Sequence, residues 1–424
     1  MIDELKVISR TSSSSYRERK EKRIPEIADE LNVAYIVEGS VQKYDDKARI
    51  TIQLIDAKND KHVWVNSYDK DIADVFKTQS EIALKVASEL TAVLTNEQAA
   101  ELQKNPTENI KAFELYQLGR FYSGKRAFDG VQKSIGYFEK AIAEDPGYAL
   151  AYAGIADSYY LTILYDAKNK EYNRSKALEF ANKALEIDNQ LAEAYTVLAT
   201  IYSFVDWNWE AAEKAFLKGI EYNPNFSNIH HRYSEHLSMT GRIEMARKHI
   251  NRALELDPLS FIIRAVSAQD YYDRGLFKEA QTEFIICSDI FMNRFHWLIH
   301  DAEFQLNYRF ENAQKLIDNL KVVEDKYGVM SSSGKIDSIH NAYGLKGLAR
   351  YRAEIEPDPF YKATFYGLCG DDEKAMGFLE ISFDREVYFP AYTSYMYEFK
   401  NLHSNPRFIA LMKKINLPWS PDDE

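Results

Sequence analysis

Histidine and glutamate residues occur in two groups whose spacing could hold a metal ion. Residues three or four positions apart share one face of a helix, and imidazole and carboxylate groups are ligands that zinc takes. The two groups are His296, His300 and Glu303, and His230, His231 and Glu235. Neither contains the H-E-x-x-H arrangement of zinc proteases. We therefore predict structural or partner-binding roles for these histidines, and no metal site.

Two charged segments could bind ions. Asp371, Asp372 and Glu373 follow Gly370, where acidic side chains are favoured at the start of the next helix. Residues 17–23 read R-E-R-K-E-K-R, and the two glutamates weaken the field of this basic cluster. We interpret the first segment as the acidic first turn of a helix. The second is interpreted as a solvated loop, with contact to an anion or a lipid headgroup as the alternative.

Motifs that build nucleotide-binding or hydrolytic sites are absent from the sequence. It contains no G-x-x-x-x-G-K-[ST], no G-x-G-x-x-G and no G-x-S-x-G. No other group of residues indicates acid–base or nucleophilic catalysis. We therefore predict a protein that has no catalytic residues and needs no cofactor.

The composition favours a helical protein of two or three domains. The chain has 424 residues, 46% of them hydrophobic, and its 17 glycines and 11 prolines are fewer than average. The formal net charge of −12 disfavours a nucleic-acid partner, because phosphates would be repelled. No apolar run reaches the roughly 18 to 20 residues that a membrane-spanning helix needs. Cys287 and Cys369 are the only cysteines, which excludes a disulfide framework.

Residues 1–95 have the pattern of a small α/β domain. Apolar and polar side chains alternate in the central segment, which predicts a half-buried strand between two neighbours in an antiparallel meander. The expected strands are residues 34–43, 47–57 and 62–68.

Helices are expected on both sides of this meander. Pro25 and Glu26 suit the first turn of a short helix that begins at Ile24. Apolar residues at helical spacing predict a longer helical region over residues 71–103. Residues 5–9 could form one more strand.

From Lys111 onward the sequence repeats itself. Pro224 and Pro258 are 34 residues apart and each follows an amphipathic segment, as Pro146 also does. Small residues let two antiparallel helices approach, large residues fill the space between hairpins, and proline ends the second helix. Because each hairpin leaves an apolar face unburied, neighbouring hairpins must stack.

The same positions place five repeats along the chain. Their small, large and proline positions are Gly119, Tyr122, Phe138, Ala141 and Pro146; Ala156, Tyr159, Ala177 and Ala184; Ala199, Tyr202, Ala212 and Gly219; Gly241, Ala246, Ala253 and Pro258; and Ala268, Tyr271, Gly275, Ala280, Phe284 and Cys287. The pattern weakens after Asp301. The expected divisions are a helical linker over residues 96–110, five clear repeats and one degenerate repeat over 111–327, a linker over 328–345, and C-terminal hairpins with a cap over 346–424.

This repeat half resembles the tetratricopeptide (TPR) family. The N-terminal block resembles the TolB-like amino-terminal domain that precedes such repeats in many bacterial proteins. The segments that carry the second resemblance are V-I-S-R-T-S at 7–12, I-P-E-I-A at 24–28, L-N-V at 31–33, V-E-G-S-V at 37–41, Q-L-I-D-A at 53–57, Trp64, Tyr68 and D-V-F at 74–76. The end of the chain, N-P-R-F at 405–408 followed by Leu417 and Pro418, is also similar to how these proteins end.

The resemblance implies a small N-terminal α/β domain, an antiparallel meander with helices, followed by an all-α TPR-type solenoid. It also implies a first strand and a first helix before Leu5, so we expect the domain to be truncated at its start. Family members are commonly fused to an upstream nucleotide cyclase, kinase or winged-helix regulator. The cytoplasm is the favoured compartment, and the periplasm is the alternative if an N-terminal segment is missing.

The first helix of each TPR hairpin lines a concave groove that usually binds a peptide. The residues expected to face this groove are Phe113, Tyr116, Arg120, Asp157, Tyr160, Thr196, Thr200, Phe204, His231, Glu235, Gln269, Tyr272, His300 and Glu303. Arg120 and Arg232 alone do not supply the basic cluster that grips a peptide carboxylate. We therefore expect a partner held by stacking and hydrogen bonds, with core packing as the alternative role for the aromatic residues.

These observations predict a non-enzymatic scaffold that binds a protein or peptide partner in the groove. The alternative is a sensory or regulatory module of a signalling protein whose output domain lies upstream. An enzyme that uses the histidine-bearing face is the least favoured class. The sequence leaves the partner and the oligomeric state open.

Overall fold

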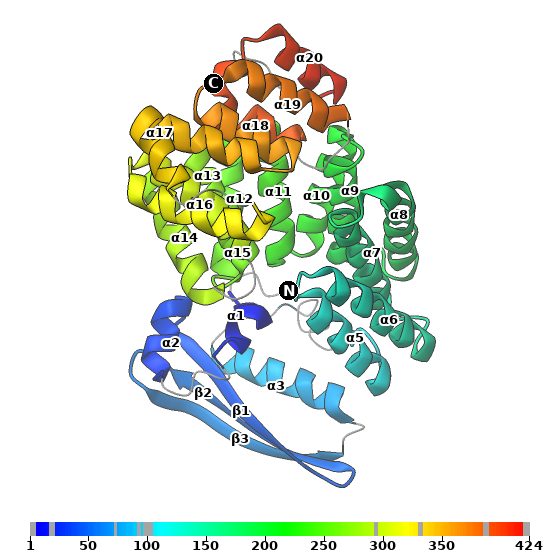
Figure 1. Cartoon of the computed structure of the whole chain (residues 1–424). Helices are drawn as coiled ribbons and strands as arrows, with labels where there is room; N and C mark the ends of the chain where they lie inside the picture. The colour runs from blue at the N-terminus through cyan, green and yellow to red at the C-terminus, as the bar shows by residue number, and fades with distance from the viewer. Residues whose placement is uncertain are drawn as a thin grey trace. The chain divides into compact units, whose positions relative to one another are not determined.

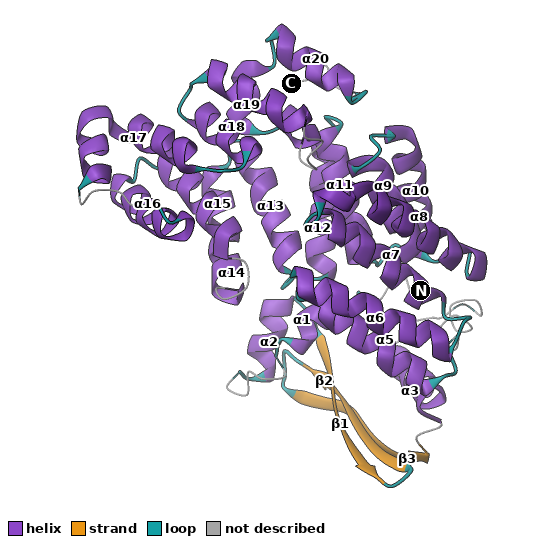
Figure 2. Ribbon diagram, turned by 45° about the vertical axis from the view of Figure 1, so that its right-hand side comes forward, coloured by secondary structure: helices purple, strands orange, loops and turns teal. Residues whose placement is uncertain are grey.

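The computed structural model describes residues 6–16, 22–71, 74–90, 95, 105–291, 296–329, 334–384 and 390–418. In these residues a three-stranded antiparallel sheet is followed by helices as far as the C-terminal region (Figures 1 and 2). The expected fold class, a small α/β domain before an all-α array of helical hairpins, is confirmed. None of the helices in these ranges combines the length and the apolar character needed to cross a bilayer.

The chain divides into two compact units. The first consists of Met1–Ile201, Glu213–Ile229 and Arg252–Leu259, and the second of Tyr202–Ala212, His230–Asn251 and Ser260–Glu424.

The sheet of the first unit is a meander, as the alternating pattern predicts. Strand β1 (Tyr35–Tyr44) pairs with β2 (Lys47–Asp56), which pairs with β3 (Lys61–Asp71). The turn between β1 and β2 consists of Asp45 and Asp46, and Asp45 takes the left-handed conformation that tight hairpins require. Strands β1 and β3 are therefore the two edges of the sheet.

The predicted short helix is present as α2 (Ile24–Leu31). The Glu26 carboxylate accepts a hydrogen bond from the Arg23 backbone N–H at 3.0 Å, which satisfies a donor at the helix start. The longer helical region contains α3 (Val75–Glu89), which packs on β3. Most of the linker expected over residues 96–110 lies outside the described residues.

The expectation of a strand at residues 5–9 is wrong for the described residues 6–9, which are not in a strand. The Ser9 hydroxyl instead accepts a hydrogen bond from the Ser12 backbone N–H and starts helix α1 (Arg10–Ser14). A serine at this position favours a helix start because its side chain replaces a missing backbone acceptor.

Helical hairpins follow in the order that the repeat pattern predicts. The helices are α5 (Ile110–Ser123), α6 (Phe128–Glu144), α7 (Ala149–Ile163), α8 (Lys170–Ile187), α9 (Ala192–Phe204), α10 (Trp209–Tyr222), α11 (Ser227–Met239), α12 (Ile243–Leu256), α13 (Phe261–Asp273), α14 (Phe277–Phe291), α15 (His296–Arg309) and α16 (Ala313–Tyr327). Pro146, Pro224 and Pro258 each lie two residues beyond the end of a second helix, α6, α10 or α12. The equivalent positions of these prolines are confirmed.

The C-terminal region adds further helices and two short 3₁₀ helices. They are α17 (Lys335–Ile355), α18 (Pro359–Leu368), α19 (Asp372–Asp384), η3 (Pro390–Ser394), η4 (Tyr397–Leu402) and α20 (Pro406–Lys414). Helix α17 is kinked at Gly344, whose φ of 62° is left-handed, so part of the expected linker over 328–345 is helical. Asp372 and Glu373 lie in the first turn of α19, as their interpretation as helix-start charge requires.

The Phe138 ring shows how two hairpins pack in the first unit. The ring is buried, and a Cβ atom added to Gly119 of α5 or to Gly154 of α7 would lie 2.5 Å or 2.7 Å from it. Both glycines therefore make room for the same side chain of α6. Tyr116, whose ring centroid lies 5.6 Å from that of Phe138, completes the contact.

We expect Gly119→Ala and Gly154→Ala each to destabilise the protein by about 1 to 3 kcal/mol, because the enclosed Phe138 ring cannot move away from the new methyl group. Gly136→Ala is the matched control. Gly136 lies within α6 and an added Cβ meets nothing within 4 Å, so this variant should gain up to about 1 kcal/mol of helix stability. The measurement is the free energy of unfolding in urea. Equal stability of the three variants would contradict this packing.

Candidate functional site

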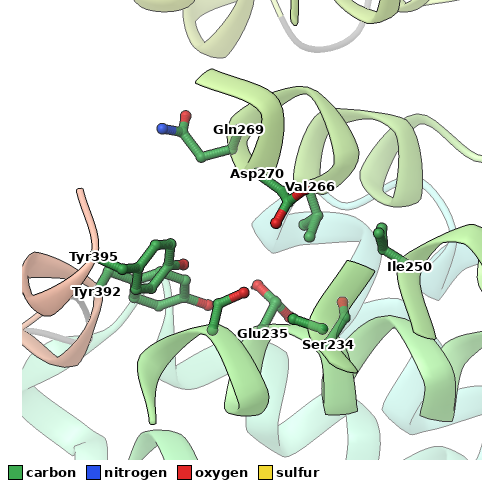
Figure 3. A pocket seen from close by; sticks show the side chains of 10 residues that line it. Ser234, Glu235, Ile250, Val266, Gln269, Asp270, Tyr392 and Tyr395 are labelled. Atoms are coloured by element: carbon green, nitrogen blue, oxygen red, sulfur yellow. The ribbon is translucent and has the colours of Figure 1, made fainter. Parts of the chain in front are cut away.

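A pocket in the second unit is lined by side chains of α11, α12, α13 and η3 and of the turn that follows η3. The space that it encloses is small, about 40 Å³. The lining residues are Ser234, Glu235, Ser238, Ala246, Ile250, Val266, Gln269, Asp270, Tyr392 and Tyr395. Figure 3 shows the two tyrosines on one side and the labelled helix side chains on the other. Hydroxyl, carboxylate and amide groups thus share one space with two aromatic rings.

Glu235 anchors η3 to α11. Its carboxylate accepts a hydrogen bond from the Tyr392 hydroxyl at 2.6 Å and lies 3.2 Å from the Arg232 guanidinium. Nε2 of His231 lies 3.3 Å from the same carboxylate. The Tyr392 ring also stacks on Phe204, with 6.2 Å between the ring centroids. This wall of the pocket is therefore held in place by charge and by aromatic packing.

Asp270 forms the opposite polar wall. Its carboxylate accepts a hydrogen bond from Nη1 of Arg247 at 2.9 Å, and the Arg247 guanidinium lies 3.5 Å from the centre of the Tyr271 ring. Burial raises the pKa of Asp270 from its ordinary value, while the charge of Arg247 opposes the rise. The arginine thus supports a carboxylate that would otherwise be costly to bury.

Tyr395 stays protonated and can donate a hydrogen bond into the pocket. Its burial raises the pKa of the hydroxyl well above the ordinary value, and the negative charges of Asp273, Glu235 and Asp270 act in the same direction. Gln269, which also lines the pocket, donates from Nε2 to both carboxylate oxygens of Asp273 at 3.1 Å. The Gln269 amide is therefore held within the fold through its nitrogen.

After η3 the chain continues into η4, whose residues contact α13 and α15, the first helices of two hairpins. The Tyr272 hydroxyl donates to Oε1 of Glu398 at 2.5 Å, and Nη2 of Arg309 lies 3.3 Å from the same oxygen. The backbone N–H of Tyr397 donates to Asp273 at 3.1 Å. A Cβ on Gly367 of α18 would lie 2.7 Å from the Glu398 carbonyl oxygen, so this approach requires glycine. The chain's own residues therefore occupy the surface on which Tyr272 was expected to meet a partner.

In the first unit a terminal segment lies on the hairpins as well. The fully buried Ser12 of α1 donates from its hydroxyl to Asp257 at 2.5 Å and accepts from the Leu259 backbone N–H at 2.8 Å. The Ser9 N–H donates to the Leu256 carbonyl at 2.8 Å, and Arg10 contacts Gln117 of α5. Helix α1 thus joins α5 to the end of α12.

The residues predicted to face a groove differ widely in exposure. Arg120 and Glu303 are exposed, Phe113, Asp157 and Gln269 are half-buried, and Tyr116, Tyr160, Thr196, Thr200, Phe204, His231, Glu235 and Tyr272 are buried. The side chain of His300 lies outside the described residues. The structure brings Glu235 and Gln269 together at the pocket, with Phe204 behind Tyr392.

Other members of the set make contacts within the fold. The hydroxyls of Thr196 and Thr200 donate to backbone carbonyls one turn earlier in α9, at 2.8 Å and 2.6 Å. Tyr116 packs on Tyr148 with 5.0 Å between ring centroids, and burial raises the pKa of Tyr116 to about 12. Their assignment to a partner-binding surface stays a prediction.

The histidines do not form a three-ligand cluster in the part of the chain that the structure describes, where no group of three His, Cys, Asp or Glu residues could hold a metal ion. Nδ1 of His230 instead lies 2.9 Å from Nδ1 of His249 on α12, and the two rings stack. Nδ1 of His236 lies 2.9 Å from the Ser203 hydroxyl. The side chains of His296 and His300 are outside the described residues.

Sequence reasoning missed the C-terminal contribution to the pocket. Tyr392 lies in the 3₁₀ helix η3 and Tyr395 in the turn that follows it, where neither a helical nor a strand period marks the inward side. Asp270 was also missed, although it follows Gln269 directly. The one available signal was the group of tyrosines at 392, 395 and 397 after Pro390.

Comparisons with known proteins return partial similarities. No family model matches the chain. A protein of Rhizobium meliloti (strain 1021), named as a candidate adenylate cyclase 3, is 27% identical to this chain over 211 residues. These residues are 48% of this chain and 35% of that protein. Transcriptional regulator HilA of Salmonella typhimurium is 22% identical over 240 residues, 57% of this chain and 43% of that protein. The chain thus spans less than half the length of these curated relatives.

Similar solved structures include TPR proteins. TTC0263, a thermophilic TPR protein of Thermus thermophilus, has 18% identity and a TM-score of 0.37, with 45% of this chain and 98% of that chain covered. The pilF protein of Pseudomonas aeruginosa has 16% identity and a TM-score of 0.38, with 52% and 93% covered.

We expect Asp273→Asn to flatten the dependence of stability on pH. Burial, followed by the charge of Glu398, raises the pKa of Asp273 well above its ordinary value of 3.8. The folded protein then holds a proton that the unfolded chain has lost, so this group's contribution to stability is complete below the ordinary pKa and falls as the pH rises toward the folded pKa. Asparagine does not titrate, so the Asp273→Asn variant does not lose stability in this way as the pH rises.

The measurement is the free energy of unfolding in urea between about pH 4 and pH 7. The variant should be more stable than the wild type at the upper end of this range, by an amount on the order of 1 kcal/mol or more. Asp325→Asn, at an exposed position of α16, is the control for the loss of one carboxylate. A wild-type slope retained by Asp273→Asn would show that Asp273 is not the group responsible.

Proposed function

We propose that this chain is a non-enzymatic interaction scaffold that holds a peptide or protein partner at the groove formed by the first helices of its hairpins. The observation that carries this proposal is the small pocket of the second unit, because Glu235 and Gln269 of the expected groove set line it together. In the same proposal residues 1–95 are a TolB-like domain and residues 111–327 carry the repeats.

The pocket suits one side chain of a partner. The enclosed space of about 40 Å³ lies well below the range for small-molecule sites, so an extended peptide would insert only the tip of one side chain and run over the remaining surface. The Tyr395 hydroxyl supplies a donor, and the Gln269 carbonyl supplies an acceptor. The Tyr392 ring adds an aromatic wall, so a polar side chain with an apolar stem matches these groups.

Both charged walls already have partners within the fold. Arg232 lies beside Glu235 and Arg247 beside Asp270, so the pocket presents little net charge to a ligand. Recognition by hydrogen bonds and ring contacts is therefore favoured over recognition by a strong charge. A nucleic-acid partner is disfavoured, since the whole chain carries a formal charge of −12.

The alternative function, a sensory or regulatory module of a signalling protein, has less support. It rests on the names of an adenylate cyclase and a transcriptional regulator, of which the chain spans 35% and 43%. An in-frame cyclase, kinase or winged-helix sequence upstream of Met1 in genomic DNA would favour this alternative.

We expect Gln269→Ala combined with Tyr395→Ala to weaken peptide binding by at least about tenfold, which corresponds to 1.4 kcal/mol. The immobilised full chain would first be used to select peptides from a phage-displayed random library. Isothermal titration of the selected synthetic peptides then compares the dissociation constants of wild type and variant.

Tyr343→Ala is the matched control, because Tyr343 is 74% exposed on α17 and does not line the pocket. Circular dichroism checks that every variant is folded. Selected peptides that bind the double variant as tightly as the wild type would exclude the pocket as the binding site. A library that yields no binder would count against the scaffold function itself.

A further inference from the structure

Large apolar side chains are exposed at two neighbouring hairpin turns of the first unit. Phe121 lies in the last turn of α5 and Phe128 is the first residue of α6, and both rings are about half exposed. Leu164 and Tyr165 follow α7, and Tyr172 lies in the first turn of α8; these side chains are also exposed. Exposed apolar groups that gather in this way mark a surface that binds a protein or a membrane.

Direct contacts join the two turns into one surface. The Tyr165 hydroxyl donates a hydrogen bond to the Arg126 carbonyl oxygen at 2.6 Å, and the Tyr165 and Phe128 rings meet edge to face with 6.2 Å between their centroids. Arg126 has a φ of 49°, which is uncommon for a residue other than glycine, so this hydrogen bond holds an unusual turn. We call residues 121–133 and 164–174 the hairpin-turn surface. Its rings are held in place by the fold before any partner binds.

The hairpin-turn surface is basic, although the protein is acidic. It contains six basic and three acidic side chains, whereas the whole chain has a formal charge of −12. Four of the six basic residues are lysines. The Lys125 ammonium lies 4.6 Å from the centre of the Phe121 ring and 4.7 Å from that of the Tyr122 ring. Positive charge and exposed aromatic rings therefore lie side by side.

Lysines beside exposed rings favour a lipid surface over a protein partner. Lysine is depleted from protein–protein interfaces. Surfaces that bind at the bilayer interface instead combine lysine or arginine, which attracts anionic lipids, with aromatic and aliphatic side chains that enter the headgroup boundary. The acidic remainder of the chain does not prevent this contact, because physiological salt screens exposed charges beyond about 8 to 10 Å.

We propose that the hairpin-turn surface binds the surface of a bilayer that contains anionic phospholipid. Phe121, Phe128 and Tyr172 enter the headgroup boundary, and the lysines contact the anionic headgroups. The binding is reversible, because its strength scales with the buried apolar area and only a few side chains contribute. This surface belongs to the first unit and the pocket of the proposed function to the second, so either proposal can fail without the other.

The test is sedimentation of the full chain with vesicles of phosphatidylcholine alone or of phosphatidylcholine mixed with phosphatidylserine. We expect the chain to sediment with the mixed vesicles only, and high salt to weaken this binding by at least about tenfold, because it screens the lysine charges. A chain that stays in the supernatant with the mixed vesicles would overturn the proposal. An acidic protein segment would then be the better occupant.

A charge variant examines the role of the lysines. Lys125→Glu combined with Lys168→Glu should weaken binding to the mixed vesicles by at least about tenfold, because each change replaces attraction to anionic lipid by repulsion. The matched control is Lys278→Glu combined with Lys321→Glu, which changes the net charge equally at exposed positions of α14 and α16. The control should bind like the wild type. Equal loss in both variants would show a response to net charge alone and would overturn the assignment to this surface.

An apolar variant examines the role of the rings. Phe121→Ser combined with Phe128→Ser should also weaken binding to the mixed vesicles by at least about tenfold, because less apolar area enters the headgroup boundary. Leu217→Ser combined with Ile285→Ser is the matched control, since these side chains are 50% and 54% exposed elsewhere on the chain. Circular dichroism checks that each variant is folded. Full binding by the folded phenylalanine variant would contradict insertion of the rings and overturn the proposal.

Discussion

The structure depends on one packing constraint, which is that a pair of helices cannot bury its own apolar face. The Phe138 ring illustrates the solution, because it belongs to α6 and fills a space that Gly119 of α5 and Gly154 of α7 leave open. A single side chain thereby ties two successive hairpins together. Hairpin surfaces that have no further hairpin packed against them must also be covered by some other part of the chain.

Terminal segments of the chain meet that requirement in each unit. In the first unit α1 places the buried Ser12 hydroxyl against Asp257 and the Leu259 backbone. In the second unit η3 and η4 lie on α11, α13 and α15 through Tyr392, Tyr397 and Glu398. The pocket beside Gln269 lies next to these contacts, and the proposed function rests on it.

The sequence predicts the hairpins well because their signals are local and periodic. Small residues such as Gly119 and terminating prolines such as Pro258 recur at fixed spacing, and the same spacing placed Glu235 and Gln269 on the first helices. The C-terminal half of the pocket could not be found in this way. Tyr392 bonds to Glu235 across 157 residues of sequence, and its 3₁₀ segment has no period that marks an inward side. Burial of Tyr272 likewise depends on Glu398, 126 residues later.

These long sequence separations have a consequence for synthesis on the ribosome. Glu235 emerges 157 residues before Tyr392, so at about 5 to 20 residues per second its partner is absent for roughly 8 to 30 seconds. During translation the nascent α11 and α13 therefore present their polar and aromatic side chains uncovered. A chaperone that recognises such surfaces would have this interval in which to bind, and completion of the last residues would end it.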